Sequence, residues 1–346
     1  MRASPAVPTV QTRVPTEDLS RIRRLIEAAT LADGSAPLSE QALLRLRPDG
    51  QGPDRHVLLR VADGPSDQVL AGYAQVDPQG GQGGQGAVAE LLVHPEHRRR
   101  GLGRVLLQAV QRAAGPGSLG VWAHGDGPAA RALAEGAGMV PSRTLHRWFR
   151  DLGDDLPAVV LPEGIGLRTF RPGQDEEPWL ALNALAFASH PEQGRWTAQD
   201  LRARMAEPWF DPEGFLLAQA DGPDGRPVLA GFHWTKIHES VPGLPAGLRA
   251  GTGRERVGEV YVVGVHPNHR GRGLGRILTV AGLHRLRSYG LRLAMLHVDG
   301  DNHVAQAVYR KLDFRHGDTD VLFVRPSIDR AGPAPFPAPE APGEWL

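Results

Sequence analysis

The chain contains no cysteine, and only 6% of its 346 residues are aromatic. The absence of cysteine excludes disulfides, thiolate metal ligands and a cysteine nucleophile. It is consistent with a reducing compartment. Lysine is almost absent as well, because Lys236 and Lys311 are the only lysines among the 39 basic residues.

The sequence also lacks an excess of charge of either sign and any long apolar run. Its 39 basic and 39 acidic residues give a formal net charge of zero, whereas nucleic-acid-binding domains are usually basic. No apolar segment approaches the roughly 20 residues that cross a bilayer, and the first residues lack the apolar core of a signal peptide. We therefore expect a cytoplasmic protein with neither a nucleic-acid nor a membrane partner.

One eleven-residue segment occurs twice, 172 residues apart. The two copies, HPEHRRRGLGR at 94–104 and HPNHRGRGLGR at 266–276, are identical at nine positions. This period is far longer than those of solenoid repeats. The sequence therefore predicts a duplicated domain.

The residues around both copies predict the same order of elements. A strand-like apolar run precedes each copy, and an apolar helical period, a short strand and a second helix follow. The expected strands are 56–61, 70–76, 87–93 and 119–123, then 215–220, 228–234, 258–265 and 291–298, and the second helices are 128–137 and 302–312. This order predicts an α/β fold of two tandem domains, each a mixed central sheet flanked by helices.

Composition suggests where the domains end. The stretch from Asp151 to Gly164 is rich in Pro, Gly and Asp, and a new strand pattern begins at Ile165. We predict an N-terminal domain at 1–152 and a C-terminal domain at 165–325. Residues 326–346 are rich in Pro and Ala without an apolar period, which predicts a disordered tail.

The glycine-rich part of the repeat predicts an anion site. Gly271, Gly273 and Gly275 follow a strand and open a helix. Glycines allow backbone N–H groups to approach a ligand, and the positive end of the helix dipole favours a pyrophosphate. A dinucleotide fingerprint needs different glycine spacing and a later acidic residue, and a P-loop needs Gly-Lys-Ser/Thr. Two interpretations of the glycine-rich segment remain: it binds a coenzyme A-type ligand, or it is a purely structural turn.

At these residues the chain resembles the GCN5-related N-acetyltransferase (GNAT) superfamily, whose motif is Arg/Gln-x-x-Gly-x-Gly/Ala. Arg270, Gly273 and Gly275 match it, as do Arg98, Gly101 and Gly103. The resemblance implies acetyl-CoA as co-substrate, with its pantetheine arm along the strand before the motif. The residues implied for acetyl-CoA are Leu91, Leu92, Val93, Arg99, Arg100, Gly101, Leu102, Gly103, Arg104, Val263, Gly264, Val265, Arg270, Gly271, Arg272, Gly273, Leu274, Gly275, Arg276, Asn302, His303, Val304, Ala305, Gln306 and Ala307.

A second superfamily motif, Asn-x-x-Ala-x-x-x-Tyr, fits Asn302, Ala305 and Tyr309. The resemblance implies that Tyr309 protonates the departing coenzyme A thiolate. A thiol of pKa about 8.5 leaves more easily when it is protonated as it goes. Gly127 and Ala134 stand at the Asn and Tyr positions of the first domain. We therefore predict that this domain holds acetyl-CoA at most and is catalytically silent.

The nucleophilic amine must be neutral before it attacks. Neutralisation at pH 7 costs roughly 4.6 kcal/mol for a lysine-like amine and about 1 kcal/mol for an α-amino group. Glu259 is the candidate proton acceptor, directly or through water. Strand alternation predicts that Glu259, Tyr261 and Val263 share one face.

Longer segments resemble the mycothiol synthases, tandem GNAT enzymes. They include Trp122–Gly125, His190–Thr197, Trp209–Pro212, Gly231–Lys236 and Gly258–Val262. The resemblance implies a small-molecule substrate, cysteinyl-glucosaminyl-inositol, acetylated at its cysteinyl amine to give mycothiol. It implies substrate contacts from Glu40, Glu192, Lys236 and Glu259, and Glu40 would have to reach the second domain. His297 stands where these enzymes usually have Tyr, and we include it among the substrate contacts.

Two alternatives stay open at this point. The enzyme could acetylate another amine, such as a protein N-terminus, a polyamine or an aminoglycoside. A non-catalytic acyl-CoA sensor is the other alternative, although it would not need to keep Tyr309. The paired histidines of the repeat have no third ligand, so we expect no metal, and two fused domains lead us to expect a monomer.

Overall fold

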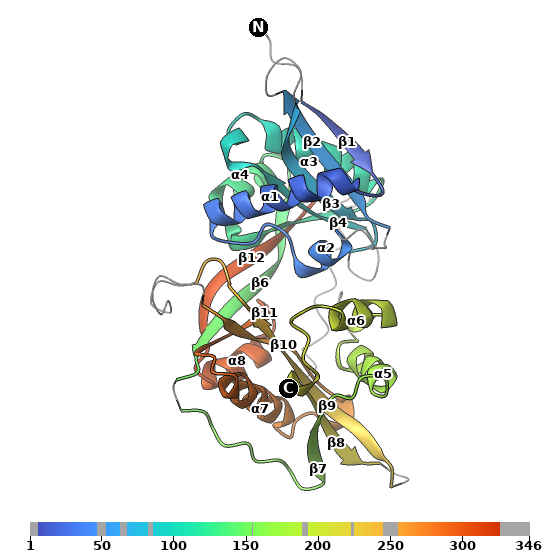
Figure 1. Ribbon diagram of the computed structural model, residues 1–346, viewed down its shortest axis with the longest axis vertical. Helices are drawn as coiled ribbons and strands as arrows, with labels where there is room; N and C mark the ends of the chain where they lie inside the picture. The colour runs from blue at the N-terminus through green and yellow to red at the C-terminus, as the bar shows by residue number, and fades with distance from the viewer. Residues whose placement is uncertain are drawn as a thin grey trace. The chain divides into compact units, whose positions relative to one another are not determined.

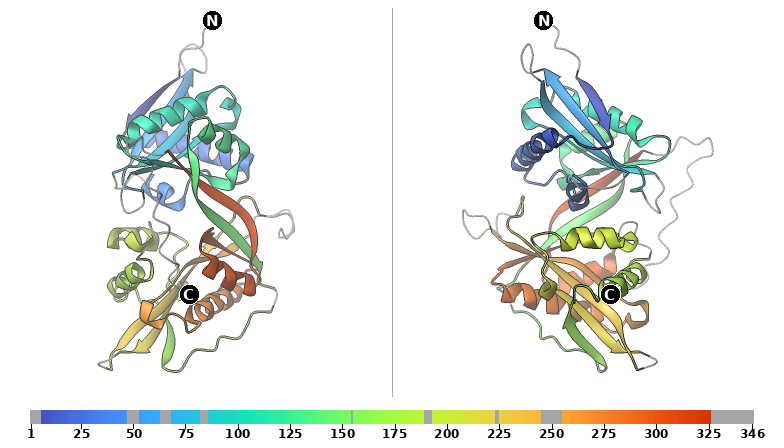
Figure 2. Two further views of the ribbon diagram at one scale, coloured as in Figure 1. Left: turned by 180° about the vertical axis from the view of Figure 1, so that it is seen from behind. Right: turned by 45° about the vertical axis from the view of Figure 1, so that its right-hand side comes forward.

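The computed structural model describes residues 6–46, 53–62, 68–81, 86–153, 155–188, 193–222, 225–244 and 255–325. The chain forms two compact units. Unit 1 holds the described residues of Met1–Thr144 and Thr319–Phe336, and unit 2 holds those of Leu145–Asp318 and Pro337–Leu346. Each unit is an α/β layer structure with helices on both faces of a mixed sheet (Figures 1 and 2).

In unit 1 the strands follow the order β1-β2-β3-β4-β5-β12, with only β4 and β5 parallel. The elements of this part of the chain are β1 (Val7–Gln11), α1 (Thr16–Asp33), α2 (Glu40–Arg45), β2 (Arg55–Ala62), β3 (Gln68–Asp77), β4 (Ala87–Val93), α3 (Leu102–Ala114), β5 (Leu119–Ala123), α4 (Pro128–Glu135) and β6 (Val140–Asp151).

Two apolar clusters bury the two faces of the unit 1 sheet. Helix α3 places an apolar stripe that includes Leu106 and Val110 against Val57 and Val76. On the other face, α1 and α2 pack against Leu58, Tyr73 and Leu92. Val57 and Val76 thus face α3, whereas Leu58 and Tyr73 face the other side, as side-chain alternation along a strand requires.

In unit 2 the order is β6-β11-β10-β9-β8-β7, with only β10 and β11 parallel. The elements are β7 (Ile165–Thr169), α5 (Glu176–Ala186), α6 (Ala198–Met205), β8 (Phe215–Asp221), β9 (Pro227–His238), β10 (Val257–Val265), α7 (Leu274–Ser288), β11 (Leu293–Asp299), α8 (His303–Lys311) and β12 (Arg315–Arg325).

The unit 2 sheet is also covered on both faces. Helices α7 and α8 pack with Val260, Leu296 and Val298 on one face. Helices α5 and α6 cover the other face through an aromatic cluster that contains Trp179 and Trp234. A site residue of unit 2 therefore lies either on the face covered by α7 and α8 or on the face covered by α5 and α6.

Strands β6 and β12 are exchanged between the two units: β6 joins the strands of unit 2, and β12 joins those of unit 1. Residues Leu145–Asp151 of β6 pair antiparallel with β11 in unit 2. Residues Val321–Arg325 of β12 pair antiparallel with β5 in unit 1. The last strand of the first half thus completes the second sheet, and the last strand of the chain completes the first.

The predicted α/β class of tandem domains built on mixed strands flanked by helices is confirmed. The domain limits 1–152 and 165–325 stay a prediction, and the two compact units differ from them by the exchange of β6 and β12. The tail at 326–346 lies outside the described residues. Among the described helices, none is long and apolar enough to cross a membrane.

Candidate active site

The two glycine-rich turns have the same backbone conformation. Gly101 precedes α3 with φ +78°, and Gly273 precedes α7 with φ +72°. Neither helix has a side-chain cap, and a Cβ added at either glycine would meet no atom within 4 Å. Uncapped N–H groups at the positive end of a helix beside open space form an anion site.

Arginines lie around both turns. The exposed ones are Arg99, Arg100, Arg104, Arg272 and Arg276. The first arginine of each motif is instead tied back into its unit. Arg98 donates to both carboxylate oxygens of Asp33 at 2.6 and 2.8 Å, and Arg270 donates to the carbonyl of Ala186 at 2.9 Å.

The parallel strands separate just before each turn. In unit 1 the β4–β5 ladder covers Ala87–Glu90, and in unit 2 the β10–β11 ladder covers Gly258–Val260. The following residues, Leu91–Val93 and Val263–Val265, keep only their antiparallel neighbours β3 and β9. In both units the described part of the neighbouring parallel strand leaves a backbone edge unpaired at the predicted pantetheine segment.

Only the second of these strands carries a bulge. The β10–β9 register shifts between Val260 and Val262, so Tyr261 is an extra residue, while β4 pairs with β3 without a shift. The bulge moves Val263 to the face opposite Glu259, so the prediction that they share a face is wrong. Gly264 is required by close packing, because a Cβ there would lie 2.6 Å from the ring of Phe232.

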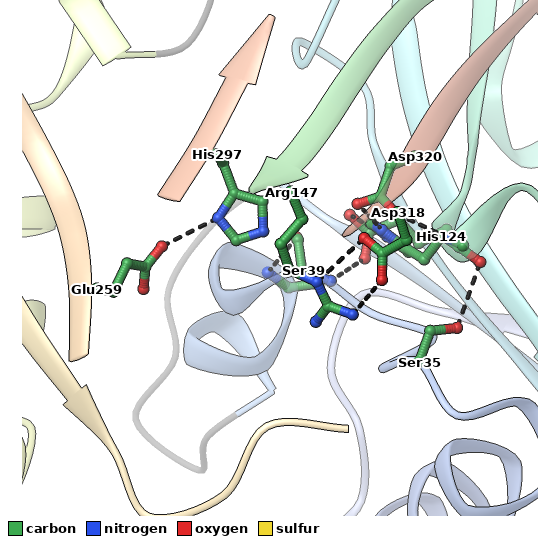
Figure 3. A network of polar contacts seen from close by, with 11 residues as sticks. Ser35, Ser39, His124, Arg147, Glu259, His297, Asp318 and Asp320 are labelled. Carbon is green, nitrogen blue, oxygen red and sulfur yellow. Dashed lines mark hydrogen bonds and ion pairs between the residues drawn. The ribbon is translucent and has the colours of Figure 1, made fainter. Parts of the chain in front are cut away.

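Glu259 lies between two histidines, on the face opposite α7 and α8. His238 Nε2 lies 2.6 Å from Glu259 Oε2, and His297 Nδ1 lies 3.0 Å from Glu259 Oε1 (Figure 3 shows the latter contact). Burial alone would raise the pKa of the Glu259 carboxyl, but the hydrogen bonds to His238 and His297 hold that pKa well below its usual value. The carboxylate is therefore ionised across the neutral range.

Lys236 joins this group from β9. It is the direct cross-strand partner of Glu259. Its ammonium lies 4.7 Å from the ring centroid of Trp209 and 5.2 Å from that of Tyr261, which are cation–π distances. The structure thus brings together the predicted residues Lys236, Glu259 and His297. Sequence reasoning missed His238, whose signal was its position two residues after Lys236 on the same strand.

Tyr309 lies on the other face of the sheet. It is buried on α8 among Leu296, Val298 and Leu283, with its ring 5.8 Å from that of Phe314. Burial raises the pKa of its phenol well above the ordinary value, so the group stays protonated. Asn302 caps α8, its Oδ1 accepting from the N–H of Ala305 at 3.0 Å.

The other α8 residues predicted to contact acetyl-CoA lie in different surroundings. Gln306 is buried and donates to the carbonyls of Asp299 and Gly300 at 2.9 and 3.0 Å. His303 and Ala307 are exposed, and Val304 is half-buried.

Unit 1 has a different polar centre at the corresponding place. His124 follows β5, with Nδ1 2.9 Å from Asp320 (Figure 3) and Nε2 3.8 Å from Glu90. Burial alone would lower the pKa of His124, but these two carboxylates outweigh it and raise the pKa to about 10. Sequence reasoning missed this cluster. Ala134 lies instead on α4, in the apolar cluster with α3, and supplies no hydroxyl.

The two remaining predicted substrate residues are Glu40 and Glu192. Glu40 belongs to unit 1, where it is the first residue of α2 after the Ser39 cap. Glu192 lies outside the described residues, as do 245–254 of the loop before β10. Among the described residues, no three His, Asp or Glu side chains are grouped to hold a metal ion.

Comparison with known proteins gives a consistent result. The sequence profile of the "Acetyltransferase (GNAT) family" matches residues 22–139 and 179–314. Curated relatives named "Mycothiol acetyltransferase" are 50% identical in Thermomonospora curvata, over 89% of this chain and 94% of the relative, and 49% identical in Thermobispora bispora, over 91% and 99%.

Solved structures show the same fold. A GCN5-related N-acetyltransferase from Sphaerobacter thermophilus has a TM-score of 0.61 and 27% identity, covering 92% of this chain and 95% of that one. A tandem GNAT protein from the clavulanic acid biosynthesis pathway has a TM-score of 0.63 and 21% identity, covering 93% and 98%.

The family match and these relatives show that the chain is an acetyltransferase. It belongs to the acetyltransferase (GNAT) family and, within that family, to the mycothiol acetyltransferases.

Proposed function

We propose that unit 2 transfers an acetyl group from acetyl-CoA to the cysteinyl amine of cysteinyl-glucosaminyl-inositol, which gives mycothiol. The observation that carries this proposal is the asymmetry between the units. Both have an uncapped glycine-rich turn and an unpaired strand edge. Unit 2 adds the Glu259 carboxylate, which His238 and His297 hold ionised, and the buried phenol of Tyr309, whereas unit 1 has Ala134 at the tyrosine position.

The described residues fit acetyl-CoA in two places. The pyrophosphate would lie over Gly273 and the first N–H groups of α7, with Arg272 and Arg276 exposed beside them. The pantetheine amides would pair with the unpaired edge of Val263–Val265, as an added strand does. Asn302 to Ala307 would border the same ligand from α8.

The transfer itself needs one proton acceptor and one proton donor. The amine nitrogen attacks the thioester carbonyl and must then lose a proton to the group around Glu259, either to the carboxylate directly or through an intervening acceptor. The carbon–sulfur bond breaks as Tyr309 gives its proton to the sulfur, which avoids expulsion of a free thiolate. An α-amino group suits this site because it needs only about 1 kcal/mol to become neutral at pH 7.

Recognition of the substrate rests on charged groups of unit 2. Lys236 presents an ammonium to hydroxyl or carbonyl oxygens, and its two flanking aromatic rings restrict where that ammonium lies. Glu259 and His297 complete the group. We propose Glu192 and, from unit 1, Glu40 as further contacts.

Unit 1 is proposed to bind and support rather than to react. It keeps the uncapped turn at Gly101 and the unpaired edge of Leu91–Val93. It lacks the β10-type bulge, the phenol and the neighbouring Asn. Action as a cytoplasmic monomer without a metal stays a prediction.

The test is acetyl-CoA consumption with a panel of amines. The panel contains cysteinyl-glucosaminyl-inositol, free cysteine, a peptide with a free N-terminus, spermidine and kanamycin. We expect turnover with the first compound to exceed that with the others by at least about tenfold. No rate above background with it, or a faster rate with another amine, would contradict the proposed substrate.

A further inference from the structure

We infer that His297 Nε2 is the atom that takes the proton from the reacting amine, with Glu259 orienting the ring and His238 fixing Glu259. The inference rests on the proposed acetyl transfer and deepens it.

The first argument concerns the hydrogen-bonding capacity of Glu259. Its side chain is 8% exposed, and each carboxylate oxygen already has an imidazole nitrogen at 2.6 or 3.0 Å. An amine approaching this carboxylate would have to displace one of the two rings. Displacement would leave a buried carboxylate with one fewer donor, which is costly.

The second argument concerns exposure. The His297 side chain is 36% exposed, compared with 22% for His238. Among the three members of the group, His297 is therefore the most accessible to a substrate.

The third argument concerns position along the strands. The parallel ladder between β10 and β11 ends at the pair Val260–Leu296, and His297 is the next residue of β11. It therefore lies where the two strands begin to separate, beside the edge proposed for the pantetheine arm. Its neighbours Leu296 and Val298 point to α7 and α8, so the His297 ring projects from the opposite face with Glu259.

The fourth argument concerns the tautomer. An ionised carboxylate only accepts hydrogen bonds, so His297 Nδ1 must donate its proton to Glu259 Oε1. In neutral imidazole the other nitrogen, Nε2, then carries a lone pair. A carboxylate that fixes a histidine tautomer in this way also stabilises the imidazolium that forms. His238 likewise donates through Nε2 to the second oxygen and is a positioning residue.

The step balances as follows. The amine lone pair forms the carbon–nitrogen bond while the carbonyl π pair moves to oxygen, and the nitrogen's proton moves to His297 Nε2. The oxygen pair then re-forms the carbonyl, and the carbon–sulfur pair leaves with sulfur and takes the Tyr309 proton. The imidazolium returns its proton to water and the phenolate regains one, which leaves one amide and one thiol.

The experiment compares variants of the full chain by thiol release from acetyl-CoA with cysteinyl-glucosaminyl-inositol. His297→Ala should lower kcat about 10²–10⁴-fold, the usual contribution of a general base, with the KM for acetyl-CoA changed less than threefold. Added imidazole should restore part of the lost rate in proportion to its concentration. Glu259→Gln should lose kcat without any response to imidazole.

The remaining variants separate positioning from chemistry. His238→Gln keeps an N–H donor and should stay within about threefold of the parent, whereas His238→Ala should lose about tenfold. His316→Gln, a histidine of β12 in the same unit, is the matched control and should be unchanged. Full activity of His297→Ala with loss in Glu259→Gln would overturn the inference and leave the proposed function intact. A parent enzyme without turnover would instead refute the proposed function.

Discussion

Replacement of Tyr309 by Phe removes one hydroxyl and leaves the rest of the side chain unchanged. The ring is buried and packs edge-on against Phe314 at 5.8 Å, and phenylalanine reproduces that contact. We therefore expect the free energy of unfolding to change by less than about 1 kcal/mol, as for volume-conserving exchanges. The chemical consequence is larger, because the thiolate must leave without a proton donor.

The size of the kinetic effect follows from the leaving group. General acids contribute about 10²–10⁴-fold, and a thiol of pKa about 8.5 is already a competent leaving group. We therefore expect the lower end, a loss of about 10²-fold in kcat, or ~2.7 kcal/mol at 1.36 kcal/mol per decade. Because burial raises the Tyr309 pKa, the parent enzyme should show no loss of this acid as pH rises through 9.

The assay follows thiol release from acetyl-CoA with each variant at saturating amine, alongside thermal unfolding. Tyr289→Phe is the matched control, since Tyr289 is a partly buried tyrosine of the same unit whose hydroxyl donates to Asp211. It should lose some stability and keep its kcat. A Tyr309→Phe enzyme within threefold of the parent kcat, with the same melting temperature, would refute the assignment of Tyr309 as the acid.

Three further predictions concern stability. Gly282→Ala would ordinarily stabilise a helix by ~1 kcal/mol, but its Cβ would lie 2.1 Å from the buried His233 ring. We therefore expect urea unfolding to show at least ~2 kcal/mol of destabilisation. A rise in stability would contradict the packing of Gly282 against His233. Arg150 is buried and donates to the carbonyls of Leu312 and Asp155. Arg150→Met should therefore lower the free energy of unfolding by roughly 2–4 kcal/mol. A change below about 1 kcal/mol would argue against these hydrogen bonds. The pKa of His124 is raised to about 10 in the folded state, above the ordinary value near 6.5. The contribution of charged His124 to the free energy of unfolding is therefore complete below about pH 6.5 and is lost as the pH rises toward 10. The stability difference between the parent and His124→Asn should shrink over that window, and a constant difference would show that His124 is not held as the cation.

Several features of the fold and site were accessible from the sequence because they depend on local chemistry. The repeated turn needs glycine at positive φ before a helix, and that requirement appears directly in the residues. The strand–helix–strand–helix core around each copy follows from apolar periods. The expected strands at 87–93 and 119–123 match β4 and β5 as the structure has them.

Other features depend on partners far apart in the chain. Neither β6 nor β12 was among the expected strands, and local sequence cannot show that β6 pairs with β11 while β12 pairs with β5. A period-two pattern specifies which face of a strand is buried and does not specify the neighbour.

In the site, too, some features follow from local sequence and others depend on distant strand pairing. Resemblance predicted Lys236 and His297, a motif predicted Tyr309, and Glu259 was predicted both as the proton acceptor and by resemblance. The bulge at Tyr261 turned Val263 to the other face, because one extra residue reverses the alternation beyond it. His238 entered the group only because β9 and β10 pair in one register. The residue types and their spacing identified the family, whereas strand register decided which charged side chains meet, because that register depends on partners far apart in the chain.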